Sequence, residues 1–367
     1  MTTSAAPRFG ASELGRFLSA PYAGEGFSPI EGPGVVVLDL AATSADEAEL
    51  WRGALQGQLP NLPCVTIAIE GASEFQSESG DLSDAKHALA LACDVVLSST
   101  HDLDAFLGGF SKTPIAALAF VQLLRSAPRA SIYAGLVAES FVYSTLQAGP
   151  EFGAWLKARK KPSLATGVPA AGDEPACRFE RDRHRLTITL CRPAKHNAFS
   201  RELRDALVEG LQLAQADPSI EEVVLCGEGE SFCSGGDLDE FGSAPNPAEA
   251  HVIRTTRSPA LLISGLAGRI RSEVHGACLG AGIELPAFTD RIFASEDAFF
   301  QLPEVAMGLI PGAGGTVSLP RRIGRQRTAW LGLSGSRIDA QTALAWGLVD
   351  EVRLGQHIDH RVSTNSN

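Results

Sequence analysis

The sequence is short of basic residues and lacks long apolar runs. Its 31 Lys and Arg residues stand against 43 Asp and Glu residues, which gives a formal net charge of −12. A nucleic-acid backbone needs a basic face, so this balance argues against a general nucleic-acid-binding protein. No apolar run approaches the roughly 20 residues that cross a bilayer, and residues 1–17 lack the apolar core of a signal peptide. We therefore expect a cytoplasmic protein without a membrane partner.

Several signatures of cofactor, metal or covalent chemistry are missing too. The seven cysteines are odd in number, form no Cys-x-x-Cys pair and mostly lie in apolar segments, as is typical of buried thiols in a reducing compartment. No group of His, Cys and carboxylate residues has the spacing of a metal site. The Gly-x-Ser-x-Gly turn of a serine hydrolase is absent, and the glycines after Gly276 have the wrong spacing for a dinucleotide fingerprint. We expect neither a metal nor a separate cofactor.

Two carboxylates, Glu284 and Glu304, stand in glycine-rich surroundings late in the chain. Their apolar neighbours make ionisation costly, which suits a carboxyl group that takes and gives protons near neutral pH. Gly276, Gly280 and Gly282 would let a ligand approach the backbone, and the N–H groups of a helix that begins here could stabilise an oxyanion. Singly, each acid could be a surface charge beside a turn. The pair, with glycine turns before and after, favours a site.

An early segment predicts a strand, a helix and a second strand. Apolar runs at 35–40 and 64–69 are typical of buried strands, and Ser44 with Glu47 forms a capping box that would begin the helix between them. This order implies parallel strands joined by a right-handed crossover. Residues 113–160 then predict two or three helices.

The same order returns later, so we expect two copies of one unit. Strands are predicted at 186–190 and 223–226, with an amphipathic helix at 200–216 between them. Two short echoes support the repeat: residues 79–82 resemble residues 234–238, and residues 93–99 resemble residues 289–295. Between these markers the first copy is too short to hold a counterpart of Glu284.

Residues 177–354 resemble the catalytic core of the enoyl-CoA hydratase/isomerase (crotonase) superfamily. Four motifs match in order and spacing: Arg192–Ala198, Ser231–Leu238, the turn from Gly276 to Glu284, and Pro303–Glu304 followed by Ile310–Thr316. The resemblance implies an α/β fold of the ClpP/crotonase type, which is a spiral of ββα units. Residues 111–162 resemble the helices that normally end such a chain, although here they precede the core.

These observations predict a domain order. We expect a degenerate crotonase-like N-terminal domain with a helical segment at 1–165, a linker at 166–176, the catalytic core at 177–354 and a polar tail at 355–367. The helices would complete the pocket of the core, either within the chain or from a neighbouring subunit. The resemblance also implies a homo-oligomer, a trimer or a hexamer.

The resemblance implies roles for individual residues. The N–H groups of Gly236 and Ala281 would form the oxyanion hole for a thioester carbonyl, and Glu284 with Glu304 would be the acid pair of a hydratase. The implied substrate and CoA contacts fall on Lys195, Ala198, Ser234, Asp237, Leu238, Gly280, Gly312 and Gly314.

Other polar residues could serve a function, but a structural role or simple solvent exposure also explains their presence. Arg192 and Lys195 stand where the family often binds the nucleotide end of CoA. The remaining candidates are more simply explained as surface charges, braces of turns or structural histidines: Arg321, Arg322, Arg325 and Arg327 as charges, Asn197 and Asp237 as braces, and His196 and His275 as the histidines. The segment 238–267, with Arg254 and Arg257, would line the acyl pocket.

Both acids together favour hydration of a 2-enoyl-CoA to a 3-hydroxyacyl-CoA, with coenzyme A entering as part of the substrate. Which of the two acids acts as the base is open. The alternatives on the same scaffold are an enoyl-CoA isomerase and a hydrolase of CoA thioesters or carbon–carbon bonds. A CoA-binding assembly subunit without turnover is a further alternative, because the first copy is degenerate. A scaffold has no reason to bury two acids, so an enzyme is favoured.

Overall fold

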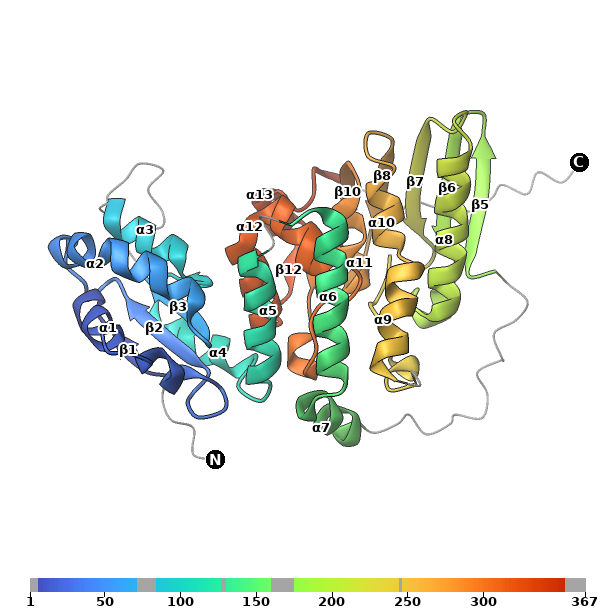
Figure 1. The fold of residues 1–367 in the computed structure, drawn as a ribbon. Helices are drawn as coiled ribbons and strands as arrows, with labels where there is room; N and C mark the ends of the chain where they lie inside the picture. The colour runs from blue at the N-terminus through green and yellow to red at the C-terminus, as the bar shows by residue number, and fades with distance from the viewer. Residues whose placement is uncertain (1–5, 71–83, 127–129, 160–174, 244–245, 354–367) are drawn as a thin grey trace, which may run out of the picture. The chain divides into compact units, whose positions relative to one another are not determined.

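The computed structural model describes residues 6–70, 84–126, 130–159, 175–243 and 246–353 (Figure 1). The chain forms two compact units. The first comprises Met1–Arg129, Glu304–Ile310 and Gly324–Gly335, and the second comprises Ala130–Pro303, Pro311–Ile323 and Ser336–Asn367. No helix in the described part of the chain has both the length and the apolar character needed to cross a bilayer.

The first unit is built on a four-stranded parallel sheet in the order β1-β2-β3-β4. Its strands are β1 (Arg8–Phe9), β2 (Val35–Asp39), β3 (Val65–Ile69) and β4 (Val95–Leu97). Every residue of β2 and β3 is buried, as the apolar runs predict for strands covered on both faces. The parallel pairing of β2 with β3 expected from the strand–helix–strand order is confirmed.

The helices of the first unit are α1 (Ala11–Leu18), α2 (Ala45–Gln58), α3 (Asp84–Ala92), α4 (Leu103–Gly108) and α5 (Pro114–Ser126). The first three of them share one apolar core. The predicted capping box begins α2: the Glu47 N–H donates to the Ser44 hydroxyl at 3.2 Å, and the Ser44 N–H donates to the Glu47 carboxylate at 3.0 Å. Leu14, Leu55 and Leu89, one from each of the first three helices, are fully buried in this core.

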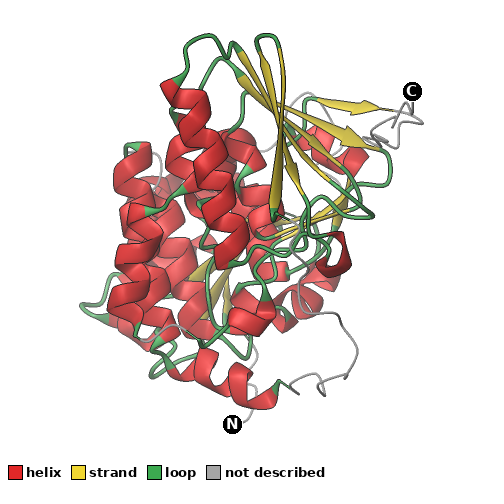
Figure 2. Ribbon diagram, turned by 90° about the vertical axis from the view of Figure 1, so that its right-hand side faces the viewer, coloured by secondary structure: helices red, strands yellow, loops and turns green. Residues whose placement is uncertain are grey.

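The second unit contains two sheets (Figure 2). The larger has the order β13-β10-β8-β7-β6-β5, and all its neighbours are parallel except the β5/β6 hairpin. Its strands are β5 (Cys177–Asp182), β6 (Arg185–Leu190), β7 (Glu222–Gly227), β8 (Ile270–Val274), β10 (Arg291–Ser295) and β13 (Glu351–Arg353). The smaller sheet, in the order β12-β11-β9, consists of β9 (Ala277–Leu279), β11 (Phe299–Gln301) and β12 (Ile338–Asp339).

Successive segments of the second unit give one strand to each sheet and then form a helix. β8 turns into β9 at Gly276, where φ is 53° and an added Cβ would lie 2.0 Å from the carbonyl oxygen of Glu230. Only glycine fits such a turn. β10 and β11 repeat the arrangement before α12 (Gly315–Ser334), which changes direction at Gly324 with a φ of 79°. The expected crotonase-like α/β spiral of ββα units is therefore confirmed in the second unit.

The other helices of the second unit are α6 (Ile132–Gln147), α7 (Pro150–Ala158), α8 (Arg201–Ala216), α9 (Pro247–Thr256), α10 (Pro259–Ser264), α11 (Ala281–Glu284) and α13 (Ala340–Trp346). Of the two or three helices expected over 113–160, the structure has three, α5, α6 and α7. Helices α6 and α7 belong to the second unit, although the sequence places them in the domain at 1–165. Residues 166–174 of the expected linker and the tail at 355–367 lie outside the described residues, so that domain division stays a prediction.

Asp94 and Asp290 make matching contacts in the two units. The Asp94 N–H donates to the Thr66 carbonyl, and the Asp94 carboxylate accepts from the Thr66 N–H, both at 2.9 Å. Asp290 makes the same two contacts with Ile270, at 2.9 and 3.0 Å. The echo between residues 93–99 and 289–295 is therefore structural. The echo at residues 79–82 lies outside the described part of the chain.

The Asp94 contacts also correct the alignment of the two copies. Thr66 lies in β3 and Ile270 in β8, and each of these strands pairs directly with the strand that follows its aspartate, β4 or β10. The counterpart of β3 is consequently β8 and not β7, the strand at 223–226 that the order of elements suggested. The descent of the first unit from a crotonase copy stays a prediction.

Candidate active site

Glu284 is buried at the end of α11 and is held by the turn before α12. Its side chain is 2% exposed, and its Oε2 accepts hydrogen bonds from the N–H groups of Ala313, at 2.7 Å, and Gly315, at 2.8 Å. An added Cβ at Gly315 would lie 2.7 Å from the Glu284 Cγ, so the carboxylate packs directly on the glycine backbone. The glycine-rich turn predicted from the sequence therefore positions this acid.

A second buried carboxylate, Glu139 of α6, binds the same turn. Its Oε1 accepts from the N–H of Gly314 at 2.7 Å, and its Oε2 accepts from the N–H and the hydroxyl of Thr316 at 2.9 and 2.6 Å. Burial raises the pKa of Glu139 to about 7, against the lowering effect of the hydrogen bonds from Thr316 and Gly314. The sequence analysis missed this residue. The available signal was that Glu139 is the one charged residue of α6.

Gly236 and Ala281, the expected oxyanion-hole donors, lie on adjacent loops of the second unit. Cys233 and Cys278 form a parallel bridge, and the Leu279 N–H donates to the Cys233 carbonyl at 2.9 Å. Within the described ranges, no protein oxygen accepts a hydrogen bond from the N–H of Gly236 or of Ala281. Two backbone donors on neighbouring loops can bind one carbonyl oxygen.

Glu304 precedes the short 3₁₀ turn at Val305–Met307, and its carbonyl accepts hydrogen bonds from the N–H groups of Met307 and Leu309, at 3.0 and 3.1 Å. It belongs to the first unit, whereas Glu284, Gly236 and Ala281 belong to the second. The meeting of the two acids at one substrate therefore stays a prediction.

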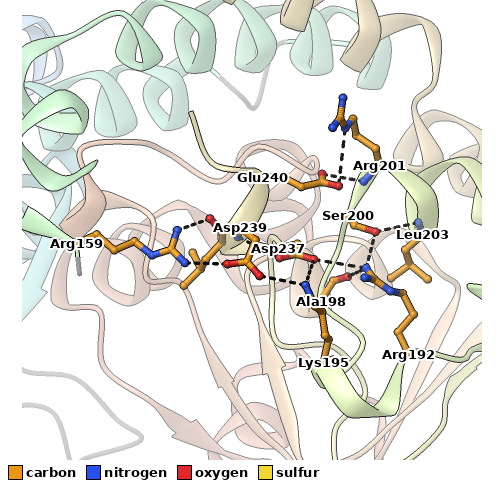
Figure 3. A network of polar contacts seen from close by, with 11 residues as sticks. Arg159, Arg192, Lys195, Ala198, Ser200, Arg201, Leu203, Asp237, Asp239 and Glu240 are labelled. Atoms are coloured by element: carbon orange, nitrogen blue, oxygen red, sulfur yellow. Dashed lines mark hydrogen bonds and ion pairs between the residues drawn. The ribbon is translucent and has the colours of Figure 1, made fainter. Parts of the chain in front are cut away.

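Lys195 lies in a network of acidic side chains (Figure 3). Its Nζ is 3.3 Å from the Asp237 Oδ2 and 3.1 Å from the Asp239 Oδ2. The hydrogen bond that Lys195 donates to Asp239 and the charge of Asp237 raise the pKa of Lys195, against the lowering effect of burial. Arg159, the residue after α7, contacts Asp239 at 3.3 Å and donates to the Leu238 carbonyl. Two of the three N–H donors of Lys195 are thus engaged by carboxylates, and a CoA phosphate would compete with their negative charge.

Asn197 and Asp237 brace loops, as expected. Asn197 is fully buried and donates to the carbonyls of Glu228 and Ser231, each at 2.9 Å. Asp237 caps the turn at Leu238–Glu240 by accepting from the Asp239 N–H at 3.1 Å. Asp237, which the sequence predicts to contact CoA, thus stabilises the conformation of this loop.

The remaining predicted contact residues lie on the same loops. The Ser234 N–H donates to the His196 carbonyl and the Gly280 N–H to the Gln301 carbonyl, both at 3.0 Å. Ala198 is buried, whereas Leu238 is 38% exposed. Gly280 has a φ of 48°, as the turn before Ala281 requires.

The candidate structural histidines and arginines bind side-chain hydroxyl groups or backbone carbonyls. His196 contacts the Ser231 hydroxyl at 3.1 Å, and His275 contacts the Gly229 carbonyl at 2.9 Å. Arg192 donates to the Ser200 hydroxyl at 2.6 Å. Within their respective units, Arg321, Arg322 and Arg325 each donate to main-chain carbonyls: to Ala130 at 2.8 Å, to Thr289 at 2.5 Å and to Cys93 at 2.8 Å.

A cavity opens beside Glu284 within the second unit. Its walls come from α6, α9, α10 and the turn at Gly312–Gly314, and its apolar lining includes Leu136, Val137, Leu261 and Leu285. Ala313 lines the cavity and also donates to the Glu284 carboxylate. Helix α6 therefore completes this cavity from within the chain. No cluster of metal-ligating side chains occurs among the residues that the structure describes.

Comparison with known proteins places the second half of the chain in a family. A model of the enoyl-CoA hydratase/isomerase family matches residues 182–362. The 2,3-dehydroadipyl-CoA hydratase of Escherichia coli (strain K12) is 37% identical over 172 residues, which are 47% of this chain and 67% of that protein. The mevalonyl-coenzyme A hydratase SIDH of Beauveria bassiana (strain ARSEF 2860) is 34% identical, with 46% and 63% covered. The 1,2-epoxyphenylacetyl-CoA isomerase of E. coli K12 is 33% identical, with 46% and 65% covered. The chain thus spans about two thirds of the length of these relatives.

Proposed function

Because the chain belongs to the enoyl-CoA hydratase/isomerase (crotonase) family, we propose that it hydrates a 2-enoyl-CoA to a 3-hydroxyacyl-CoA. The observation that carries this proposal is the buried Glu284 carboxylate, fixed by the N–H groups of Ala313 and Gly315 at the edge of an apolar cavity. An acid held in this way keeps its position while a substrate reacts beside it.

In the proposed reaction the thioester oxygen gains negative charge as water adds to C3. The N–H groups of Gly236 and Ala281 would donate to that oxygen, and one such donor typically contributes about 3 kcal/mol to the stabilisation of a transition state. Glu284 and Glu304 would hold the water, take its proton as the C3–O bond forms, and deliver a proton to C2. Because the two acids would share protons, their titrations would be coupled.

Isomerisation of a double bond is the second candidate, because the matched family includes isomerases and one similar protein is an isomerase. The presence of both Glu284 and Glu304 supports hydration over it. The binding of CoA phosphates at Lys195, a homo-oligomeric state and a cytoplasmic location stay proposals from the sequence.

The test is to mix the full-length protein with 2-enoyl-CoAs of increasing chain length and follow the absorbance of the conjugated thioester, with product masses determined afterwards. We expect loss of absorbance with the gain of one water. Glu284→Gln should lower kcat by orders of magnitude, while Glu202→Gln, an exposed acid of α8, should keep the wild-type rate. A product of unchanged mass with a shifted double bond would favour isomerisation, and turnover by Glu284→Gln at the wild-type rate would refute the role of Glu284.

A further inference from the structure

The cavity beside Glu284 carries more positive than negative charge. Three guanidinium groups line it, those of Arg204, Arg254 and Arg257, against one carboxylate among its described lining residues, that of Glu139. Glu139 is engaged by the turn before α12. Arg204 and Arg257 share a single partner, Asp205, at 2.9 and 2.6 Å. An unbalanced positive charge therefore remains in the cavity.

Arg254 of α9 is the guanidinium that lacks a carboxylate partner. It donates to the Ser140 hydroxyl at 3.2 Å, to the Gln147 side chain at 3.3 Å and to the Ser144 hydroxyl, all of them neutral groups of α6. Among the described residues, no carboxylate oxygen lies within 4.0 Å of its nitrogen atoms. Burial lowers the pKa of Arg254, against the raising effect of the Tyr143 and Glu139 charges, so the removal of this guanidinium from water is only partly offset.

The walls of the cavity include both Arg254 and the turn that holds Glu284, the proposed catalytic acid. Ala313, which holds Glu284, lines the cavity, and so does Arg254. The aliphatic side chains of Leu136, Leu261 and Leu285 also line it. A chain of methylene groups can pack on such side chains, and a group with negative charge can end at the guanidinium.

We propose that the substrates of this enzyme are CoA monothioesters of dicarboxylic acids, whose distal carboxylate binds Arg254. This inference rests on the proposed function and names the substrate class of that site. The planar fork of a guanidinium matches the two oxygens of a carboxylate, and the neutral hydroxyl groups of Ser140 and Ser144 hold the fork in place without neutralising it.

The experiment measures binding separately from turnover. The full-length protein is titrated by calorimetry with saturated CoA thioesters, which cannot add water, in matched pairs of six and eight carbons that do or do not end in a carboxylate. We expect the dicarboxylic member to bind about tenfold more tightly at one length or both, since a charged hydrogen-bonded pair forms at Arg254. Equal affinities at both lengths would overturn the inference and leave hydration untouched. A preserved preference in a protein that hydrates no enoyl-CoA would instead refute the proposed reaction alone.

Variants of Arg254 test whether its charge causes the preference for thioesters that end in a carboxylate. Arg254→Gln should reduce the affinity ratio of each pair to about one, and Arg254→Lys, which keeps the charge without the fork, should give an intermediate ratio. Arg181→Gln is the control and should keep the full affinity ratio. Arg181 lies on β5, is exposed and forms an ion pair with Asp217. An Arg254→Gln protein that folds and keeps the full preference would refute the assignment. If that variant does not fold, Arg254→Lys and the wild-type ratio decide the question.

Discussion

Glu139 and Glu284 are far apart in the sequence, yet both accept hydrogen bonds from the turn before α12. The successive N–H groups of this turn donate to the two carboxylates in alternation. Ala313 and Gly315 donate to Glu284, and Gly314 and Thr316 donate to Glu139. Both carboxylates thus lie at the amino end of α12, where unpaired N–H groups and the helix dipole favour negative charge. Glu139 does not need to touch a substrate to matter, because it fixes the turn that positions Glu284.

Replacement of Glu139 should weaken catalysis through Glu284. In Glu139→Gln the side chain keeps its size, but an NH₂ group replaces one acceptor oxygen and leaves an N–H of Gly314 or Thr316 without its partner. We expect kcat for hydration to fall about tenfold with little change in KM, as befits a positioning residue. Steady-state kinetics measure both constants. A fall in thermal stability with an unchanged kcat would show that Glu139 has only a structural role.

The stability of the protein should also report the titration of Glu139. Burial raises the pKa of this carboxyl from 4.5 to about 7, so the folded chain binds its proton more tightly than the unfolded chain does. The resulting stabilisation is fully present below about pH 4.5 and is lost as the pH rises through about 7. Between about pH 5 and pH 8 the free energy of unfolding should fall about 2 kcal/mol more for the wild type than for Glu139→Gln. Urea unfolding at both values tests this, and parallel pH dependences would contradict it.

A single substitution can remove the backbone N–H of Ala281 while the side chain at this position stays small. Ala281 is the first residue of α11, a position that tolerates proline because its N–H has no partner within the helix. Ala281→Pro should therefore fold, yet lower kcat about a hundredfold or more by deleting one oxyanion donor. Ala281→Gly, which keeps the N–H, is the matched control and should retain most activity. Comparable rates for the two variants would exclude Ala281 from the oxyanion hole.

The thiols should differ in reactivity in a way that follows their burial. Six of the seven free cysteines are buried and Cys191 is partly exposed. Burial raises the pKa of Cys64, Cys177 and Cys233 to about 12, so these groups hold almost no thiolate near neutral pH. A disulfide reagent should modify only Cys191 in the native protein and the rest after unfolding. Rapid reaction of several thiols in the native state would contradict the packing of these strands.

Local features of the chain could be predicted from the sequence because they depend on neighbouring residues. The apolar run at β2, the capping box of Ser44 and Glu47, and the glycine turn around Gly276 each satisfy a requirement within a few residues. The amides of Gly236 and Ala281 could be proposed in the same way, since the resemblance rests on short motifs. The match of β3 to β7 shows the limit, because the order of elements does not reveal that Thr66 and Ile270 make the same contacts with the aspartate before the next strand.

What the sequence by itself determined is thus the set of strands, turns and candidate acids, whereas the tertiary structure decided which distant residues serve Glu284. Glu139 lies 175 residues before Gly314, and α6 carries apolar and polar residues around its one acid, so no periodicity indicated where that acid points. Arg254 gained its meaning in the same way, from the neutral partners that α6 supplies and from the lack of a carboxylate in hydrogen-bond contact with it among the described residues. Hydrogen bonds and charge balance depend on distance in space, and only the folded chain brings these groups together.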